Sequence, residues 1–282
     1  MNDLDLLQVY SYDKKRRLGV NSDGGYIIAD LDNDYDCYIS AGISNEESFT
    51  RDFINTFNTT NNFGFDGTIN NYPYEYTKNI TFIKKNINGF NDDNNTNLSF
   101  LTDKYNNIFL KMDIEGGEYP WLLSIDESQL KKFKQIVFEI HGLFGDNWGA
   151  KYDDKVKCLR KLSNTHYIIH AHGNNNGSVI NNYPDVVELT YVNKNLFNTT
   201  PELNTQFLPV ENLDFRNNPD NFDIDMNRYP FLRIDGLIQE KLNQTKRIIY
   251  NSPNNLPNYL PQNKVNPRNM IHIYNRYNRF GR

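Results

Sequence analysis

Acidic residues and a histidine follow two buried strands of this chain, each time at a glycine turn. The apolar run 108–112 leads into Asp113 and Glu115 before two glycines, and the next apolar strand carries Glu139 and is followed by His141 before another glycine. Ligands of open parallel sheets bind beyond the carboxyl ends of the strands. The spacing therefore predicts one crevice in which carboxylates and an imidazole meet, a set that suits acid–base or metal chemistry.

These residues leave two kinds of chemistry open. His141 is the better candidate for a general base, because an unperturbed imidazole titrates at a pH of ~6.5 and this one stands at a strand end. Alternatively, Asp113, Glu139 and His141, together with His172, could hold one divalent cation such as Mg²⁺ through oxygen and nitrogen ligands. Glu118 is interpreted as a first-turn acid of a helix, where it interacts favourably with the helix dipole.

Apolar strands that alternate with amphipathic helices predict the scaffold that positions this crevice. Strands are expected at residues 35–41, 62–66, 80–84, 108–112, 135–140, 167–172 and 186–192, and helices at residues 46–56, 118–125 and 152–162. The last two strands have no helix between them, which indicates a terminal antiparallel hairpin. The predicted fold class is therefore α/β, with a Rossmann-like seven-stranded, mostly parallel sheet and helices on both faces.

The turn after the first strand has a pattern of its own. Gly42 follows the strand, and Ser44 or Asn45 is expected to cap the next helix, because either side chain can accept a helix N–H. Asp66 ends the second strand, 24 positions beyond Gly42. That spacing is typical of an acid that binds ribose hydroxyls in nucleotide-binding βαβ units.

Composition narrows the class of protein. The 282 residues carry a formal net charge of -5 with a pI near 5.6, which argues against a dedicated nucleic-acid binder. Two cysteines cannot form a disulfide framework, and no basic and apolar leader or apolar run of about 18 residues occurs. We therefore expect a cytoplasmic protein without a membrane span. Asparagine accounts for 45 residues, a bias typical of an AT-rich microbe or a large DNA virus. If the source is a virus, the expected location is the host cytoplasm.

Residues 1–225 are expected to form a domain of catalytic size, and residues 226–282 a C-terminal extension punctuated by proline and asparagine. Trp121 and Trp148 are expected to anchor the core and a loop, respectively, rather than to serve as sugar platforms, although Trp148 lies just past the fifth strand, where acceptor loops gather. The end of the chain is basic and aromatic, and we expect it to be solvated or to contact another copy of the chain rather than RNA. Its basic residues are Lys264, Arg268, Arg276, Arg279 and Arg282.

A wider pattern extends over roughly residues 15–225. It comprises Arg17-Leu18-Gly19, Asp23-Gly24-Gly25-Tyr26, Ser40-Ala41-Gly42-Ile43-Ser44, Lys111-Met112-Asp113-Ile114-Glu115-Gly116-Gly117-Glu118, Glu139-Ile140-His141-Gly142, His172-Gly173-Asn174-Asn175, Pro184-Asp185-Val186-Val187-Glu188-Leu189-Thr190-Tyr191 and Leu213-Asp214-Phe215. In order and spacing, these segments resemble the FkbM-type group of S-adenosylmethionine-dependent methyltransferases, many of which act on sugar hydroxyls.

The resemblance implies S-adenosylmethionine as the methyl donor. It places Gly42 against the methionine part of the cofactor, the ribose on Asp66, and the adenine beside Ile87 and Asn88. The catalytic residues predicted from their positions at the strand ends are His141, Glu115 and Asp113. The full set of implied cofactor-binding residues is Ser40, Ala41, Gly42, Ser44, Asp66, Ile87, Asn88 and Asp113.

The acceptor implied by the resemblance is a hydroxyl group of a sugar, nucleotide-sugar or glycan. The pKa of such a hydroxyl lies far above neutral, so a general base or a divalent cation must assist its deprotonation. Two alternatives stay open. A nucleic-acid methyltransferase would use the same sheet, and an inactive binding module would explain why the first turn keeps only Gly42 of the usual three glycines. Self-association of the chain is also left open.

Overall fold

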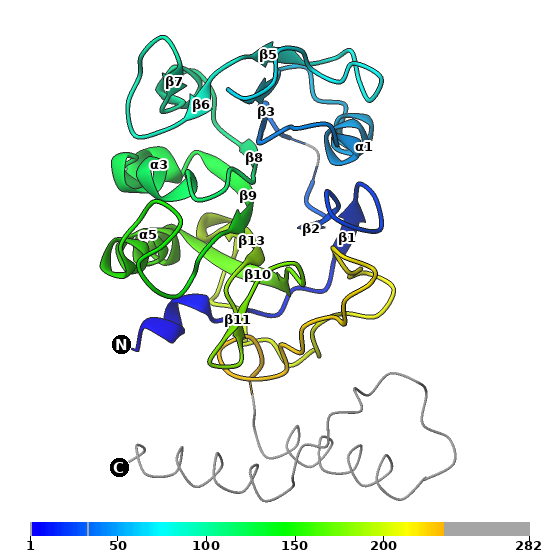
Figure 1. Ribbon diagram of the computed structural model, residues 1–282, viewed down its shortest axis with the longest axis vertical. Coiled ribbons are helices and arrows are strands. Elements are labelled where there is room, and N and C mark those ends of the chain that lie inside the picture. The colour runs from blue at the N-terminus through cyan, green and yellow to red at the C-terminus, as the bar shows by residue number, and fades with distance from the viewer. Residues whose placement is uncertain (1, 33, 234–282) are drawn as a thin grey trace, which may run out of the picture. The chain divides into compact units, whose positions relative to one another are not determined.

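The computed structural model describes residues 2–32 and 34–233 (Figure 1). The chain divides into two units, residues 1–234 and 235–282, and the described residues lie in the first. The predicted C-terminal extension lies outside the described residues from residue 234 onward, and so does its basic end.

A seven-stranded sheet forms the centre of the first unit. Its strands lie in the order β10 (His166–Gly173), β13 (Val187–Asn193), β9 (Phe133–Ile140), β8 (Ile108–Met112), β3 (Cys37–Ala41), β4 (Asn62–Phe65) and β5 (Thr81–Ile83). Strands β9, β8, β3, β4 and β5 pair in parallel, whereas β13 is antiparallel to both β9 and β10. The predicted α/β class, with a mostly parallel sheet and a terminal antiparallel hairpin, is confirmed.

Helices cover both faces of this sheet (Figure 1). One face carries α1 (Ser48–Phe57) and the antiparallel hairpin of β1 (Lys15–Leu18) and β2 (Tyr26–Ala29), and the other carries α3 (Glu118–Ser124) and α5 (Tyr152–Thr165). Shorter elements complete the unit: η1 (Asp3–Leu7), β6 (Asn86–Ile87), β7 (Asn95–Thr96), α2 (Ser99–Thr102), α4 (Glu127–Leu130), β11 (Val179–Ile180), β12 (Tyr183–Pro184) and η2 (Lys194–Leu196).

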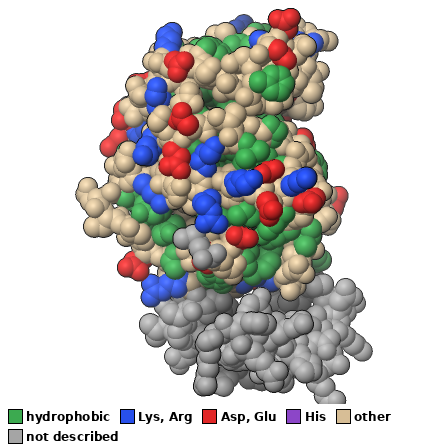
Figure 2. All heavy atoms as spheres, turned by 90° about the vertical axis from the view of Figure 1, so that its left-hand side faces the viewer, with side chains coloured by type: hydrophobic (Ala, Val, Ile, Leu, Met, Phe, Trp, Pro, Cys, Tyr) green, Lys and Arg blue, Asp and Glu red, His purple; other side chains and the backbone are tan. Residues whose placement is uncertain are grey.

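The central strands are apolar because both of their faces are covered. Every residue of β8 and β9 is buried, as expected for parallel strands between two helical layers. Trp121 of α3 is fully buried and packs its ring against Phe133 and Phe138, which confirms the predicted core role. Figure 2 shows the outer face of the layer that contains α3 and α5, where acidic and basic side chains are intermixed.

The predicted cap of the first helix is wrong. Helix α1 begins at Ser48, and its N-cap residue is Glu47, which makes no side-chain capping hydrogen bond. Ser44 lies in the preceding turn with a φ of 49°. The buried Glu47 carboxylate instead accepts hydrogen bonds from the hydroxyls of Ser40 and Tyr72. Ser44 and Asn45 therefore belong to the turn, and the helix begins only after Glu47.

No helix within the described part of the chain combines the length and apolar character needed to cross a membrane.

Candidate active site

The turn after β3 brings three strand ends together at one edge of the sheet. Gly42 has a φ of +80°, and a Cβ atom at this position would lie 1.6 Å from the carbonyl oxygen of Asp113, so only glycine fits. Its N–H donates to the carbonyl of Phe65 at 3.0 Å, and the buried Lys111 ammonium donates to the carbonyl of Gly42 at 2.7 Å. The ends of β3, β4 and β8 are thereby held in contact.

The carboxylate of Asp66 fixes the same turn. Its Oδ2 atom accepts the N–H groups of Ile43 and Ser44, both at 3.0 Å, and its Oδ1 atom accepts the N–H and hydroxyl of Thr68 at 2.7 and 2.6 Å. Burial raises the pKa of Asp66, but these hydrogen bonds outweigh burial and lower the pKa below its ordinary value. Four donors fill the acceptor positions of the carboxylate, and direct contact with a ribose stays a prediction.

A cavity of about 620 Å³ opens beside this turn. It contains six of the predicted cofactor-binding residues, whereas Ser40 and Ala41 are buried within β3 and do not line it. Three of its side chains are carboxylates, those of Asp66, Asp113 and Glu115. The complete lining is Gly42, Ser44, Phe65, Asp66, Gly67, Thr68, Asn86, Ile87, Asn88, Asn95, Asp113, Ile114, Glu115 and Gly117.

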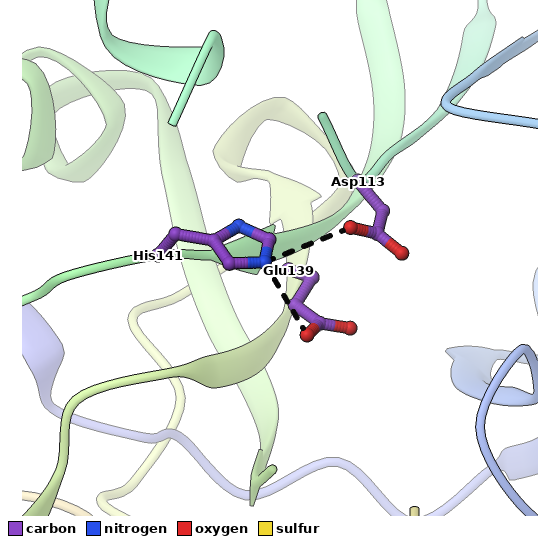
Figure 3. A group of neighbouring side chains, drawn as sticks. All are labelled: Asp113, Glu139 and His141. Carbon is purple, nitrogen blue, oxygen red and sulfur yellow. Dashed lines mark ion pairs between the residues drawn. The ribbon is translucent and has the colours of Figure 1, made fainter. Parts of the chain in front are cut away.

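His141 follows β9 and meets four carboxylates. Its Nε2 atom lies 3.3 Å from Glu115, 3.6 Å from Glu139 and 3.8 Å from Asp113, and Figure 3 shows the ring pointing toward the last two. The structure therefore brings together the three predicted catalytic residues, His141, Glu115 and Asp113, as adjacent strand ends were expected to do.

The fourth carboxylate determines which ring nitrogen carries a hydrogen. The Nδ1 atom of His141 lies 3.3 Å from Oε1 of the fully buried Glu118. Because a carboxylate only accepts, a neutral ring that keeps this hydrogen bond carries its hydrogen on Nδ1 and leaves Nε2 as a proton acceptor. Glu118 also accepts the N–H of Ile114 at 3.0 Å. Its role is therefore larger than the predicted one of a first-turn acid.

The crowding of acidic groups changes how easily they ionise. Burial alone would lower the pKa of His141, but Glu118, Asp113 and Glu115 outweigh it and raise that pKa above its ordinary value. Burial raises the pKa of Glu139 strongly, and the nearby charge of Asp113 adds to this effect. Burial also raises the pKa of Glu115. The carboxylates and the imidazole of this site therefore compete for a bound proton.

The predicted metal ligands also lie together. Asp113, Glu139 and His141 each offer one ligand atom, and these three atoms lie within 4.8 Å of one another. Two carboxylate oxygens and an imidazole nitrogen form a donor set that suits a divalent cation. His172 is engaged elsewhere, because its two nitrogens lie 3.2 Å from Glu188 and 3.0 Å from Asp223.

Several residues of the site were not assigned from the sequence. The hydroxyl of the buried Tyr26 donates to Asp113 at 3.0 Å and lies 3.4 Å from Glu139, and the amide of Asn174 donates to Glu139 at 2.7 Å. Both residues belong to segments that carry the family resemblance, which was the available signal. Lys111, which supports Gly42, lies two positions before Asp113 and appears in the sequence only as a charge within an apolar strand.

Comparison with known proteins gives one family, and the solved structures that it gives include two that are only distantly similar to this chain. A family model described as the methyltransferase FkbM domain matches residues 8–167. No curated protein matches the chain. The chain is similar to a chain of a fibrillarin/Nop5p complex (10% identity, covering 58% of this chain and 74% of that chain, TM-score 0.35). It is also similar to a protein of the NADB-Rossmann superfamily from Streptococcus agalactiae (14% identity, covering 85% of this chain and 87% of that chain, TM-score 0.30). The family match includes Gly42, Asp66, Asp113 and His141.

Proposed function

Because this chain belongs to the FkbM methyltransferase family, we propose that it transfers a methyl group from S-adenosylmethionine to a hydroxyl group of a sugar or glycan. The acceptor hydroxyl would lie at the ends of β8 and β9, where Asp113, Glu115 and His141 meet.

The charge of the cavity is the observation that carries this proposal. Its volume of about 620 Å³ is typical of a small-molecule site. The described lining residues include three carboxylates and no basic side chain. Such a lining attracts a sulfonium and an ammonium group and repels the pyrophosphate of a dinucleotide. When bound there, the cofactor would supply an electrophilic methyl group.

The residues that would hold the cofactor come from separate parts of the cavity wall. Gly42 and Ser44 would contact its methionine part, Ile87 and Asn88 its adenine, and Asp113 its ammonium group. Asp66 supports this arrangement through the hydrogen bonds that hold the Gly42 turn.

The proposed base is Nε2 of His141. Methyl transfer to oxygen forms a C–O bond, breaks the S–C bond of the donor and releases the hydroxyl proton, which Nε2 would accept. Glu118 keeps the hydrogen of the neutral ring on Nδ1, and the remaining requirement is correct placement of the two reactants. Asp113 and Glu115 would stabilise the imidazolium that results.

A divalent cation held by Asp113, Glu139 and His141 is the alternative means of lowering the pKa of the acceptor hydroxyl, supported by the convergence of these three ligand atoms. In that case the imidazole would be a ligand and could not serve as the base through the same nitrogen.

The test uses the purified full chain, labelled S-adenosylmethionine and a panel of neutral glycosides, sugar nucleotides and RNA. Calorimetry with S-adenosylmethionine and S-adenosylhomocysteine comes first, with Mg²⁺ and with a chelator. We expect binding of both compounds and label transfer to a sugar. No binding would support an inactive module, and transfer to RNA alone would support a nucleic-acid methyltransferase. Transfer that a chelator does not reduce assigns the reaction to the base alone.

A further inference from the structure

Trp148 lies in the loop between β9 and α5, beside the proposed base. The centroid of its ring is 5.0 Å from that of His141, with an angle of 41° between the ring planes. Its side chain was expected to anchor a loop, yet Trp148 is 41% exposed, whereas Trp121 is fully buried. Trp148 is not among the residues that line the cofactor cavity. The indole therefore offers an apolar surface next to His141 and outside that cavity.

The backbone holds Trp148 in a conformation that bulky residues rarely adopt. Its φ is 49°, in the left-handed region. Two glycines make room for it: a Cβ atom at Gly116 would lie 2.3 Å from the carbonyl oxygen of Trp148, and one at Gly142 would lie 2.1 Å from its indole Cδ1. Strained residues of this kind persist only where their surroundings fix them, and they cluster at binding and catalytic sites.

A buried cation braces the same loop. Lys155 of α5 is fully buried and donates hydrogen bonds to the carbonyl of Gly142 and to Oδ1 of Asn147, the latter at 2.5 Å. Burying an ammonium group is costly unless it is paired in this way. The loop is thus fixed at Gly142 and Asn147, between His141 and Trp148, and its conformation leaves the indole partly exposed instead of packing it into the core.

The surroundings of the indole select the kind of molecule that can cover it. The His141 ring beside it lies 3.3 to 3.8 Å from four carboxylates. The side chain of one of these, Glu115, is 71% exposed. A phosphate or carboxylate group placed here would be repelled, whereas sugar hydroxyls can donate to the carboxylates. The C–H groups on the flat face of a pyranose ring carry partial positive charge, which matches the negative face of an indole.

We infer that Trp148 is the platform on which the acceptor stacks, and that this acceptor is a pyranose ring with no anionic group near the reacting hydroxyl. The inference rests on the proposed function and deepens it by naming the acceptor class. Stacking on Trp148 would place one ring hydroxyl beside Nε2 of His141. Trp148 is thereby a residue that selects and positions the acceptor.

The full chain contains two tryptophans. Its tryptophan fluorescence therefore reports on the exposed Trp148 and on the buried Trp121, which serves as an internal reference. The probes are the methyl glycosides of glucose, galactose and mannose, with glucose 1-phosphate and glucuronic acid as anionic counterparts. We expect at least one neutral glycoside to change the emission of the wild-type chain, no change in Trp148→Phe, and no effect of the anionic sugars at equal concentration. No response to any glycoside, a response that persists in Trp148→Phe, or equal responses to anionic sugars would each overturn the inference.

Kinetics with the glycoside that is methylated best give an independent test. Trp148→Ala is expected to raise KM by about tenfold, Trp148→Phe by less, and both to leave kcat and cofactor affinity nearly unchanged. The control is Leu196→Ala: Leu196 is similarly exposed, and the pairing of β13 with β9 puts it at the opposite edge of the sheet. If the chain methylates a sugar and Trp148→Ala leaves KM unchanged, the inference about Trp148 is overturned but the proposed function is not. A wild-type chain that binds cofactor but methylates no sugar overturns the proposed function.

Discussion

Glu118 and His141 form a buried pair that ties the first turn of α3 to the end of β9, with Oε1 of Glu118 3.3 Å from Nδ1 of His141. The pair joins two segments that adjacent strands deliver to one edge of the sheet. It orients the ring so that Nε2 faces the exposed carboxylate of Glu115 and the lining residue Asp113. This is the arrangement of an oriented general base, in which one acid holds the imidazole and the reacting group approaches its other nitrogen.

Replacement of Glu118 by glutamine should change how activity depends on pH. The nearby carboxylates outweigh burial and raise the pKa of His141, so removal of one charge lowers that pKa. Because the base must be unprotonated, activity rises as pH passes through this pKa. The acidic limb of the kcat profile should therefore move to lower pH, and kcat should fall about tenfold or more as the ring loses its orientation. Glu115→Gln, at the exposed side of the ring, is the comparison variant: it removes a smaller contribution to the pKa and leaves the Nδ1 contact intact, so the limb should move less and the ring should keep its orientation. An unmoved limb in Glu118→Gln would count against the pair.

Removal of the imidazole should separate catalysis from cofactor binding. His141→Ala is expected to reduce kcat by about 10²–10⁴-fold, the usual contribution of a general base. Calorimetry should give nearly unchanged affinity for S-adenosylhomocysteine, because His141 is not among the residues that line the cavity. Full activity of this variant would remove the assignment of His141 as the base.

Substitution of Asp66 should damage the turn as well as the cofactor site. Asp66→Ala removes the acceptor for Ile43, Ser44 and Thr68, and hydrogen bonds to a charged group contribute roughly 1.5–3 kcal/mol each. We expect a lower free energy of unfolding in urea and weaker cofactor binding. Thr68→Val, which removes one of the donors, should have a smaller effect on both. If Asp66→Ala weakened binding but left stability unchanged, Asp66 would act as a direct ligand and not as a support of the turn.

The pairing of His172 should make stability depend on pH. Burial alone would lower the pKa of this histidine, but Glu188 and Asp223 outweigh it and raise the pKa well above its ordinary value. The charged pair then contributes its full stability below a pH of ~6.5 and loses it as pH rises through the folded-state pKa.

His172→Gln should therefore destabilise the protein most at low pH, and the difference from wild type should shrink as pH rises. Urea unfolding across the pH range measures this. His166→Gln is the control, because burial lowers the pKa of His166 to about 4 and its ring stays neutral over most of the range. A constant effect of His172→Gln at all pH values would contradict the charged pairing.

The scaffold could be predicted from sequence because its central strands are buried along their whole length. Strand β8 spans the predicted residues 108–112, and β9 extends the predicted strand by two residues at its start. The sequence shows no helix between the last two predicted strands, and this absence predicted that the two strands pair in antiparallel orientation. These features depend on patterns within short segments, which a sequence displays directly.

Contacts within the site were harder to predict because they join residues that are distant in the sequence. Tyr26 reaches Asp113 from the β1–β2 hairpin, across 87 positions. An acid in the first turn of a helix is favourable for dipole reasons alone. The presence of Glu118 there therefore gave no indication that its side chain contacts His141. The exposure of Trp148 depends on two glycines that precede it by 32 and 6 positions. Spacing along one segment carries none of this information.

The hairpin that supplies Tyr26 also has a consequence for the timing of assembly. The ribosome makes this hairpin before its partners: the carbonyl of Ile27 accepts from Thr190, 163 residues later, and Ala29 pairs with the side chain of Gln135. Contacts between such distant residues form slowly. A nascent chain that has not yet delivered Thr190 lacks part of the surface on which the hairpin docks. We therefore expect this hairpin, although it is made before the strands that it contacts, to be the last part to complete the site. Refolding should restore the sheet, as measured by circular dichroism, before it restores activity.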